Sequence, residues 1–269
     1  MPQGGSGALE EARAHDTGGG TDRGSVAGSG MRSVRIATYN VHKCQGMDQR
    51  TRPERIVRVL EEINADVVGL QEVWSVHGHR AEADQAGFIA EALGMHYIHA
   101  EARKLHGGVY GNVLLSRFPV EQHDNLDITH VGREERCVLR ADIPVEAYRL
   151  HFFNLHLGTG YFERRFQARA LMEHHVLRAP DLTGHRIVMG DLNEWTRGLV
   201  TRTLSEEFRR VDLEAPIFRR RTYPALLPFL HLDYIYLENS LRVRDAFFHT
   251  SRLALVASDH LPLVADVAL

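Results

Sequence analysis

The sequence has few cysteines, no long apolar run and no strong excess of charge. Its 2 cysteines, Cys44 and Cys137, are too few for a disulfide framework and do not have the spacing of a zinc site. We expect both to be buried free thiols. No stretch approaches the roughly 18 apolar residues that span a membrane. The formal net charge of -3 argues against a strongly cationic nucleic-acid clamp, although a local basic stripe stays open.

The first thirty residues lack what a folded core needs. They contain nine of the 23 glycines and no aromatic residue. Such a segment buries too little apolar surface to offset its ordering entropy, so we predict that residues 1–30 form a disordered Gly-rich tail. They also lack the basic start and apolar stretch of a signal peptide, and we expect a cytoplasmic protein. Met31 directly precedes the first strand-like run, and we interpret it as an alternative or true initiator.

From Met31 to Leu269 we find no linker and predict one domain. The hydrophobic periodicity predicts three helices, one opening at Arg52-Pro53-Glu54 and two over residues 83–93 and 162–177. It predicts strands over residues 34–39, 66–70, 112–115, 120–128, 137–143, 149–155, 186–189, 232–237, 243–248 and 263–267. Helices and strands mix without strict alternation, which favours mixed sheets covered by helices over a barrel of parallel strands.

Short polar motifs stand at the ends of these apolar runs. They are Thr38-Tyr39-Asn40, Leu70-Gln71-Glu72, Asn154-Leu155-His156, Gly190-Asp191-Leu192-Asn193, Leu232-Asp233-Tyr234 and Ser258-Asp259-His260. Carboxylates, amides and imidazoles that end several strands of one domain indicate a shared site. Such a site could hold a hard cation and a phosphate.

The motif Gly190-Asp191-Leu192-Asn193 follows a buried strand. Strand alternation places Asp191 and Asn193 on the same side, where they could bind a water, a metal or a phosphate oxygen. The alternative is a turn capped by their side chains. Glu72 ends another apolar strand and is either a surface residue or a ligand; oxygen ligands of this kind suit Mg²⁺ or Mn²⁺.

Adjacent Asp259 and His260 cannot easily bond each other, because successive side chains of a strand face opposite ways. Asp233 could then orient His260 and raise its basicity, which leaves Asp259 free for a metal or its water. An isolated Asp-His pair is more often an ordinary turn. Asn40 and His156 are weaker signals when taken singly.

In this order and approximate spacing, the motifs resemble the endonuclease/exonuclease/phosphatase (DNase I-like) superfamily of metal-dependent phosphoesterases. The resemblance covers residues 31–269. It implies an α/β fold, a four-layer α/β sandwich with two central mixed β-sheets flanked by helices and the site at one end. It also implies a Mg²⁺ cofactor, for which Mn²⁺ could substitute. Glu72 resembles the principal metal ligand, with Asn40 and Asp259 beside it.

The resemblance further implies catalytic and substrate-binding residues. The catalytic set is His156, Asp191, Asn193, Asp233 and His260. Arg136 falls where many members carry an arginine near the substrate, and His42 could bind phosphate or cap a loop. The reaction would be in-line attack of water on phosphorus, with His260 or Asp191 as the proton acceptor.

Three functions stay open. The first is hydrolysis of a phosphodiester or phosphomonoester that is small or lipid-derived. The second is a DNase I-like or abasic-site-type nuclease, which needs positive surface. For this, the sequence offers Arg209-Arg210 and Arg219-Arg220-Arg221, which could equally be solvated. The third is a catalytically silent binding module on the same fold. We expect a monomer without a membrane anchor, for which nucleic acid and membrane lipid both stay open as substrates.

Overall fold

The computed structural model describes residues 33–76, 83–173, 175–196, 198–212 and 221–269. The prediction of a disordered tail over residues 1–30 lies outside the described residues, as do Arg219 and Arg220 of the predicted basic feature.

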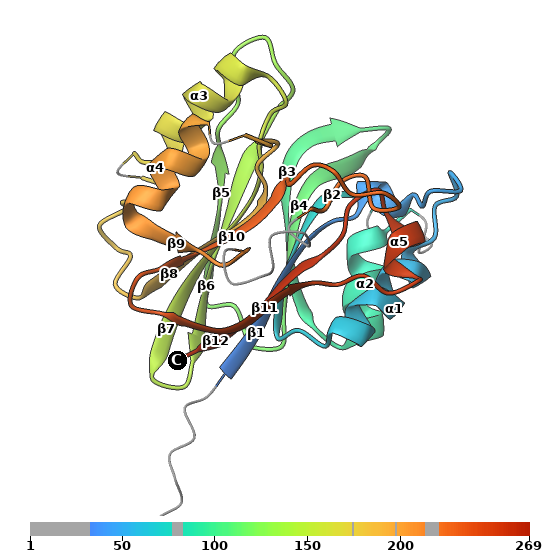
Figure 1. Ribbon diagram of the computed structural model, residues 1–269, viewed down its shortest axis with the longest axis horizontal. Helices are drawn as coiled ribbons and strands as arrows, with labels where there is room; N and C mark the ends of the chain where they lie inside the picture. The colour runs from blue at the N-terminus through green and yellow to red at the C-terminus, as the bar shows by residue number, and fades with distance from the viewer. Residues whose placement is uncertain (1–32, 77–82, 174, 197, 213–220) are drawn as a thin grey trace, which may run out of the picture. The chain divides into compact units, whose positions relative to one another are not determined.

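Two six-stranded mixed sheets form the centre of the fold (Figure 1). The first has the spatial order β11 (Arg242–Phe248), β12 (Leu263–Ala268), β1 (Ser33–Asn40), β2 (Val67–Ser75), β4 (Gly108–Ser116) and β3 (His96–Leu105). The second has the order β5 (Gln122–Asp127), β6 (Cys137–Val145), β7 (Tyr148–His156), β8 (His185–Asp191), β10 (Asp233–Glu238) and β9 (Phe208–Arg210).

Helices cover the outer face of each sheet. The first sheet carries α1 (Pro53–Ile63), α2 (Gln85–Leu93) and α5 (Ala254–Ala257), and the second carries α3 (Tyr161–Leu171) and α4 (Leu199–Glu207). Between the sheets lies a core that includes Ile36, Leu114, Phe152 and Ile235. The predicted four-layer α/β sandwich is therefore confirmed.

Local sequence explains where the first two helices begin and end. Pro53 opens α1 at its first position, where the missing N–H costs no hydrogen bond, and Asn64 closes it in the left-handed conformation. The Asp84 side chain caps α2 by accepting from the Gly87 N–H. Gly94 ends that helix at φ 63, as its position in the sequence predicted.

Each sheet contains one parallel pair among its described strands, and this pairing positions the polar motifs. β1 pairs in parallel with β2 through the crossover helix α1, and β7 pairs in parallel with β8 through α3. The carboxyl ends of parallel strands meet at one edge of a sheet. β10 runs antiparallel to β8 and begins there, so that Asp233 pairs directly with Asp191.

Several elements differ from the sequence predictions. β2 does not end at Glu72 but continues to Ser75. α3 ends at Leu171 and not at Leu177, because the chain turns there and Val176 and Leu177 pack into the core beneath α3. The periodicity also did not predict β3 or α4. The expectation of buried free thiols is confirmed for both Cys44 and Cys137.

A buried ionic cluster lies in β6 and β7, near the amino-terminal end of β7. Asp142 accepts from Arg140 Nη2 at 2.8 Å and lies 2.8 Å from His151 Nδ1. Because His151 Nε2 accepts the Gly184 N–H, the proton of the neutral ring is on Nδ1 and points at Asp142. Burial opposes ionisation of Asp142, but His151 and Arg140 outweigh it and lower its pKa below the ordinary 3.8.

This cluster predicts an acid-sensitive contribution to stability. A carboxyl whose pKa is lowered by folding stabilises the protein above its ordinary pKa, and the contribution is lost as the pH falls below about 4. Asp142→Asn should lower the free energy of unfolding at neutral pH by about 3–5 kcal/mol and flatten its dependence on acid pH, as measured by urea denaturation. Asp124→Asn, at the exposed partner of Arg140, should cost less than about 1 kcal/mol. Equal acid profiles for wild type and Asp142→Asn would contradict this.

Candidate functional site

A β-bulge turns Glu72 out of the regular pleat of β2. The register of β2 against β4 shifts between Leu70 and Val73, and Glu72 has φ 58. A bulge inserts an unpaired residue and re-aims its side chain. The Glu72 carboxylate thereby reaches the polar edge of the sheets without ending the strand.

Asn40 joins the two sheets at this edge. Its side-chain nitrogen lies 3.0 Å from Glu72 Oε1 and 3.1 Å from Asp191 Oδ2, while its Oδ1 accepts the His42 N–H. Asn40 is almost fully buried. One amide therefore contacts two carboxylates that are separated by more than a hundred residues in the sequence, and the first carboxylate comes from one sheet and the second from the other.

Asp191, Asn193 and His156 form a hydrogen-bonded group at the ends of β7 and β8. The Asn193 N–H donates to Asp191 Oδ1 at 2.8 Å. The Asn193 side-chain nitrogen donates to Leu157 O and lies 3.1 Å from His156 Nε2, which therefore acts as an acceptor. Gly190 has φ 143 and approaches Leu155 O too closely for any Cβ. Both predicted side chains of this motif thus face the same site.

Asp233 and His260 form the ion pair that the sequence suggested. Asp233 Oδ2 lies 2.9 Å from His260 Nδ1, and both side chains are buried. The Tyr223 ring packs 5.0 Å from the imidazole, centroid to centroid. The other ring nitrogen, Nε2, faces Asp191 Oδ2 at 3.7 Å. His260 is therefore fixed from both sides and its free nitrogen points at the Asp191 carboxylate.

Burial and neighbouring charges shift the pKa values of the acids and histidines in this site. Burial opposes ionisation of Glu72, but His156, Asn40, Lys43 and His42 outweigh it and lower the Glu72 pKa to about 2. Burial and the charge of Arg136 lower the His156 pKa to about 3, so this ring is neutral at pH 7. At neutral pH, Asn40 and Lys43 therefore stabilise the ionised Glu72 carboxylate.

The pKa values of Asp191 and His260 are both raised, whereas those of Glu72 and His156 are both lowered. Burial raises the pKa of Asp191 to about 7, with a further increase from the Asp233 charge. Burial alone would lower the pKa of His260, but Asp233 and Asp191 raise it to about 10. A protonated imidazole thus lies between two carboxylates, and the buried Asp191 holds its proton more tightly than an ordinary carboxyl.

His42 and Lys43 place side-chain nitrogen atoms against the acidic side chains. They lie in the short 3-10 turn η1 (His42–Cys44), whose residues have φ 45, 56 and 55. Lys43 Nζ is 3.5 Å from Glu72 Oε2, and His42 Nδ1 is 3.6 Å from Asp259 Oδ1. Successive left-handed residues other than glycine are strained and cluster at functional sites. Asp259 therefore faces His42, whereas Asp233 faces His260.

Arg136 is buried behind Glu72 and His156. Its Nη2 donates to Glu134 at 2.9 Å, and its Nε has no partner among the described residues. Together with Tyr110 it borders a small cavity that Glu72 and His156 also line. Arg136 thus lies beside the predicted site, but its guanidinium is partly occupied by Glu134.

A buried amide network supports the site from between the sheets. Gln71 Nε2 donates to Thr38 Oγ1 and to Asn154 Oδ1, and Asn154 Nδ2 donates to Leu70 O and Val113 O. A Cβ at Gly69 would touch the Asn154 amide at 3.0 Å. These motif residues therefore hold one sheet against the other and do not face the site.

The acids and histidines form a set that could hold a metal ion. One ligand atom each from Asp191, Asp233 and His260 lies within 4.8 Å of the other two, and all three residues are buried. This group differs from the predicted ligands Asn40, Glu72 and Asp259, but Asn40 joins the two by bonding Glu72 and Asp191. Within this group, burial raises the Asp191 pKa, and the Asp233 charge raises it further.

The basic stripe expected for nucleic-acid binding is not supported at Arg209 and Arg210. Arg210 pairs with the buried Asp212, and its guanidinium lies over the Tyr234 ring. Arg209 Nη2 donates to Leu241 O. Both arginines thus bond groups within the protein, and nucleic-acid binding stays a prediction.

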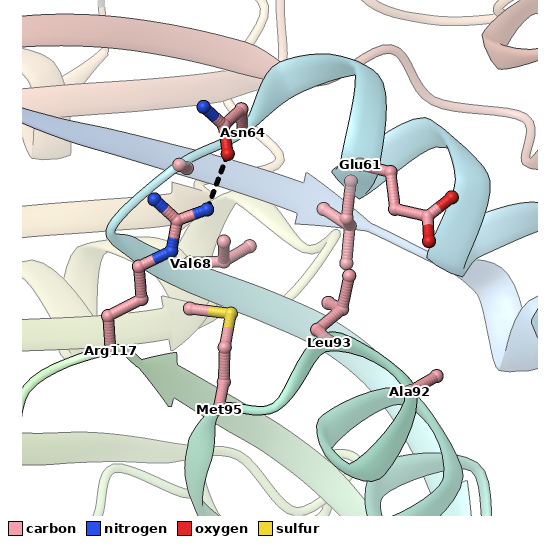
Figure 2. A pocket seen from close by; sticks show the side chains of 9 residues that line it. Glu61, Asn64, Val68, Ala92, Leu93, Met95 and Arg117 are labelled. Atoms are coloured by element: carbon pink, nitrogen blue, oxygen red, sulfur yellow. Dashed lines mark hydrogen bonds between the residues drawn. The ribbon is translucent and has the colours of Figure 1, made fainter.

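A separate cavity of about 260 Å³ lies where α1 and α2 end, beside the start of β2 (Figure 2). Leu93 and Met95 line it, and Arg117 bonds Asn64 at its rim. Val68 lines it four residues before Glu72 on β2, and its described lining contains none of the predicted site residues.

Sequence reasoning missed three contacts of the site. Tyr110 lies beside Glu72, where burial and that carboxylate raise the Tyr110 pKa. It stands two residues before Asn112 on β4, so strand alternation could have placed both on one face. The sequence allows Lys43, like His42, to bind phosphate or cap a loop, but no periodicity points it at Glu72. Tyr223 comes from a loop, and no periodicity points it at His260. Among the described residues we find no helix with the length and apolar character of a membrane span.

Comparisons with known proteins agree with this geometry. The family model of the Endonuclease/Exonuclease/phosphatase family matches residues 37–260. Uncharacterized protein YbhP of Escherichia coli strain K12 is 29% identical over 253 residues, which cover 88% of this chain and 97% of YbhP.

Solved structures share the fold. An endonuclease/exonuclease/phosphatase from Beutenbergia cavernae superimposes with a TM-score of 0.69 at 21% identity, over 88% of this chain and 72% of that one. A mannosyl-6-phosphatase from Bacteroides thetaiotaomicron gives a TM-score of 0.71 at 17% identity, over 88% and 100%. Proteins of this family are generally hydrolytic phosphoesterases that use a divalent metal. Given the match across residues 37–260, this chain belongs to the Endonuclease/Exonuclease/phosphatase family.

Proposed function

We propose that this protein is a Mg²⁺-dependent phosphoesterase that hydrolyses a phosphodiester or phosphomonoester by in-line attack of water. The observation that carries the proposal is the position of the Asn40 amide, which bonds Glu72 and Asp191 at once. Around these carboxylates lie His156 and the Asp233–His260 pair. Acids, amides and imidazoles in one buried cluster are the groups that metal-assisted hydrolysis requires.

Glu72, with Asn40 and Asp259, would hold the Mg²⁺ ion, for which Mn²⁺ would substitute. The low Glu72 pKa keeps this ligand ionised at neutral pH. Hard oxygen donors of this kind suit either ion. When bound, the ion would neutralise charge on the phosphoryl and leaving oxygens.

The remaining residues would position water and the phosphoryl group. We assign the proton-accepting role to Asp191, because Asn193 fixes one of its oxygens while the other faces His260. His260 is already charged by its two flanking carboxylates and would donate to a phosphoryl oxygen. Asp233 would orient that ring. Neutral His156 would hold the Asn193 amide through Nε2, and the guanidinium of Arg136, beside Glu72 and His156, would contact the phosphate.

For the substrate, we favour a small or lipid-derived ester over a long nucleic acid. Arg209 and Arg210 are bonded internally and offer no stripe along which a phosphate backbone could lie. The mannosyl-6-phosphatase with this fold acts, by its name, on a phosphomonoester. We further propose that the protein acts as a monomer in the cytoplasm.

A metal-dependent activity panel tests the proposal. The full chain should hydrolyse bis-p-nitrophenyl phosphate with Mg²⁺ or Mn²⁺ and lose this activity in EDTA. Abasic DNA, plasmid DNA, RNA, phospholipids and inositol phosphates then compare substrate classes. Faster cleavage of DNA or RNA with a steep salt dependence would favour the nuclease. Absence of both turnover and Mg²⁺ binding would contradict the proposal and favour a silent binding module.

A further inference from the structure

A pocket of about 430 Å³ is lined in part by Lys43, the residue that also contacts Glu72. Trp74 and Leu105 form the apolar part of its wall, and Lys43, Gln45 and Thr51 contribute polar groups. Its size falls within the range of small-molecule sites, which are mainly apolar with a few placed polar groups. We call it the Trp74 pocket.

Hydrogen bonds between its walls hold the pocket in shape. Buried Gln85 donates through Nε2 to Lys43 O at 2.6 Å and accepts the Trp74 N–H at 3.1 Å. The Trp74 indole N–H donates to Leu105 O at 2.8 Å. The turn after β1, the end of β2, the start of α2 and the β3–β4 turn are therefore tied together around a preformed space. A preformed pocket loses little ordering entropy when a ligand binds.

Lys43 connects this pocket with the predicted metal ligand. Its ammonium group is 3.5 Å from Glu72 Oε2, and the same side chain lines the pocket. Trp74 follows Glu72 by two residues on β2. A phosphoryl group at the catalytic cluster would therefore meet a cation on the pocket side, and the group esterified to it could extend along Lys43 toward the Trp74 ring.

We propose that the Trp74 pocket binds the organic group of the phosphate ester and selects esters that carry a flat aromatic ring. The inference rests on the proposed phosphoesterase function. The half-buried indole offers a ring surface for stacking, Leu105 offers apolar contact, and Gln45 and Thr51 can bond ring substituents. Lys43 binds a phosphoryl oxygen and is a substrate-binding residue, whereas the pocket decides which ester fits.

Binding of unreactive phosphonates separates these two roles. We expect phenylphosphonate to bind the full chain in Mg²⁺ about tenfold more tightly than methylphosphonate, with cyclohexylphosphonate between them, as measured by isothermal titration calorimetry. Tenfold corresponds to about 1.4 kcal/mol, the scale of one aromatic contact. Thr51→Trp, which fills the pocket from an exposed position, should abolish the preference for phenylphosphonate over methylphosphonate.

Two further variants control this experiment. Thr183→Trp changes an exposed threonine before β8 that does not line the pocket, and it should retain the full preference for phenyl. Lys43→Met should weaken both phosphonates by a similar factor, because it removes the cation without filling the pocket. Circular dichroism establishes that each variant is folded.

The outcomes distinguish this inference from the function on which it rests. If the wild type binds methyl- and phenylphosphonate equally while Mg²⁺-dependent hydrolysis is intact, the pocket does not select aromatic esters and the function stands. Retention of the phenyl preference in folded Thr51→Trp would also overturn the pocket assignment. If no phosphonate binds and no ester is hydrolysed, both proposals are wrong.

Discussion

Replacing Glu72 with glutamine should lower the Mg²⁺-dependent turnover by about 10³-fold or more. The pKa of this carboxylate is lowered to about 2, and Asn40 and Lys43 hold it ionised beside Asp191. A neutral amide of the same shape removes the charge that would bind the ion, and the loss of several kcal/mol of charge stabilisation corresponds to this factor. The measurement is kcat as a function of Mg²⁺ concentration, together with direct calorimetric titration of Mn²⁺.

A matched control separates charge loss at the site from a general effect of glutamine. Glu91 is an exposed glutamate on α2, and Glu91→Gln should keep wild-type turnover and metal affinity. Urea denaturation without metal should show that Glu72→Gln is folded, since the substitution also removes a buried charge. Turnover and Mn²⁺ affinity at wild-type levels in Glu72→Gln would show that the ion is held elsewhere.

Breaking the Asp233–His260 pair should cause the second large decrease in kcat. His260→Gln should lower kcat by about 10²–10⁴-fold, because it removes the charged donor that faces Asp191. Asp233→Asn should lower kcat by a comparable factor, because the ring loses the carboxylate that orients and charges it. The double variant should be little worse than His260→Gln alone, since the two residues would act as a unit.

The protein contains a natural control for this experiment. His151 and Asp142 form another buried pair at 2.8 Å in the second sheet, but this pair lies away from the catalytic cluster. His151→Gln should lower the free energy of unfolding and leave kcat of the folded protein unchanged. If kcat responds equally to His151→Gln and His260→Gln, or if the effects at Asp233 and His260 simply multiply, the catalytic pairing is wrong.

The sequence predicted the layers and the edge at which the site would form. Polar residues after Val188-Met189 and after Leu70 stand out against apolar strands, and the parallel pairs bring strand ends together. The pairing of Asp233 with His260 was predicted from strand alternation, but Asp259 and His260 lie in the bend between α5 and β12, so the pair forms there for another reason. Such local signals depend on few residues and can be recognised without knowledge of the tertiary structure.

The remaining features depend on tertiary contacts that periodicity does not encode. The bulge at Glu72 arises from the register of β2 against β4, so the sequence wrongly ended the strand there. β3 lies at a sheet edge with both faces partly exposed and shows no clean alternation of polar and apolar residues. Arg209 and Arg210 resembled a basic surface, but Arg210 pairs with Asp212 two residues later, and Arg209 bonds Leu241 O from a distant segment.

Anomalous diffraction from crystals of the full chain soaked in Mn²⁺ tests the central claim most directly. Our account predicts a Mn²⁺ peak within coordinating distance of the Glu72 carboxylate, and the loss of that peak in Glu72→Gln crystals. A Mn²⁺-activated enzyme whose anomalous peak lies away from Glu72, Asp191 and Asp259 would contradict it.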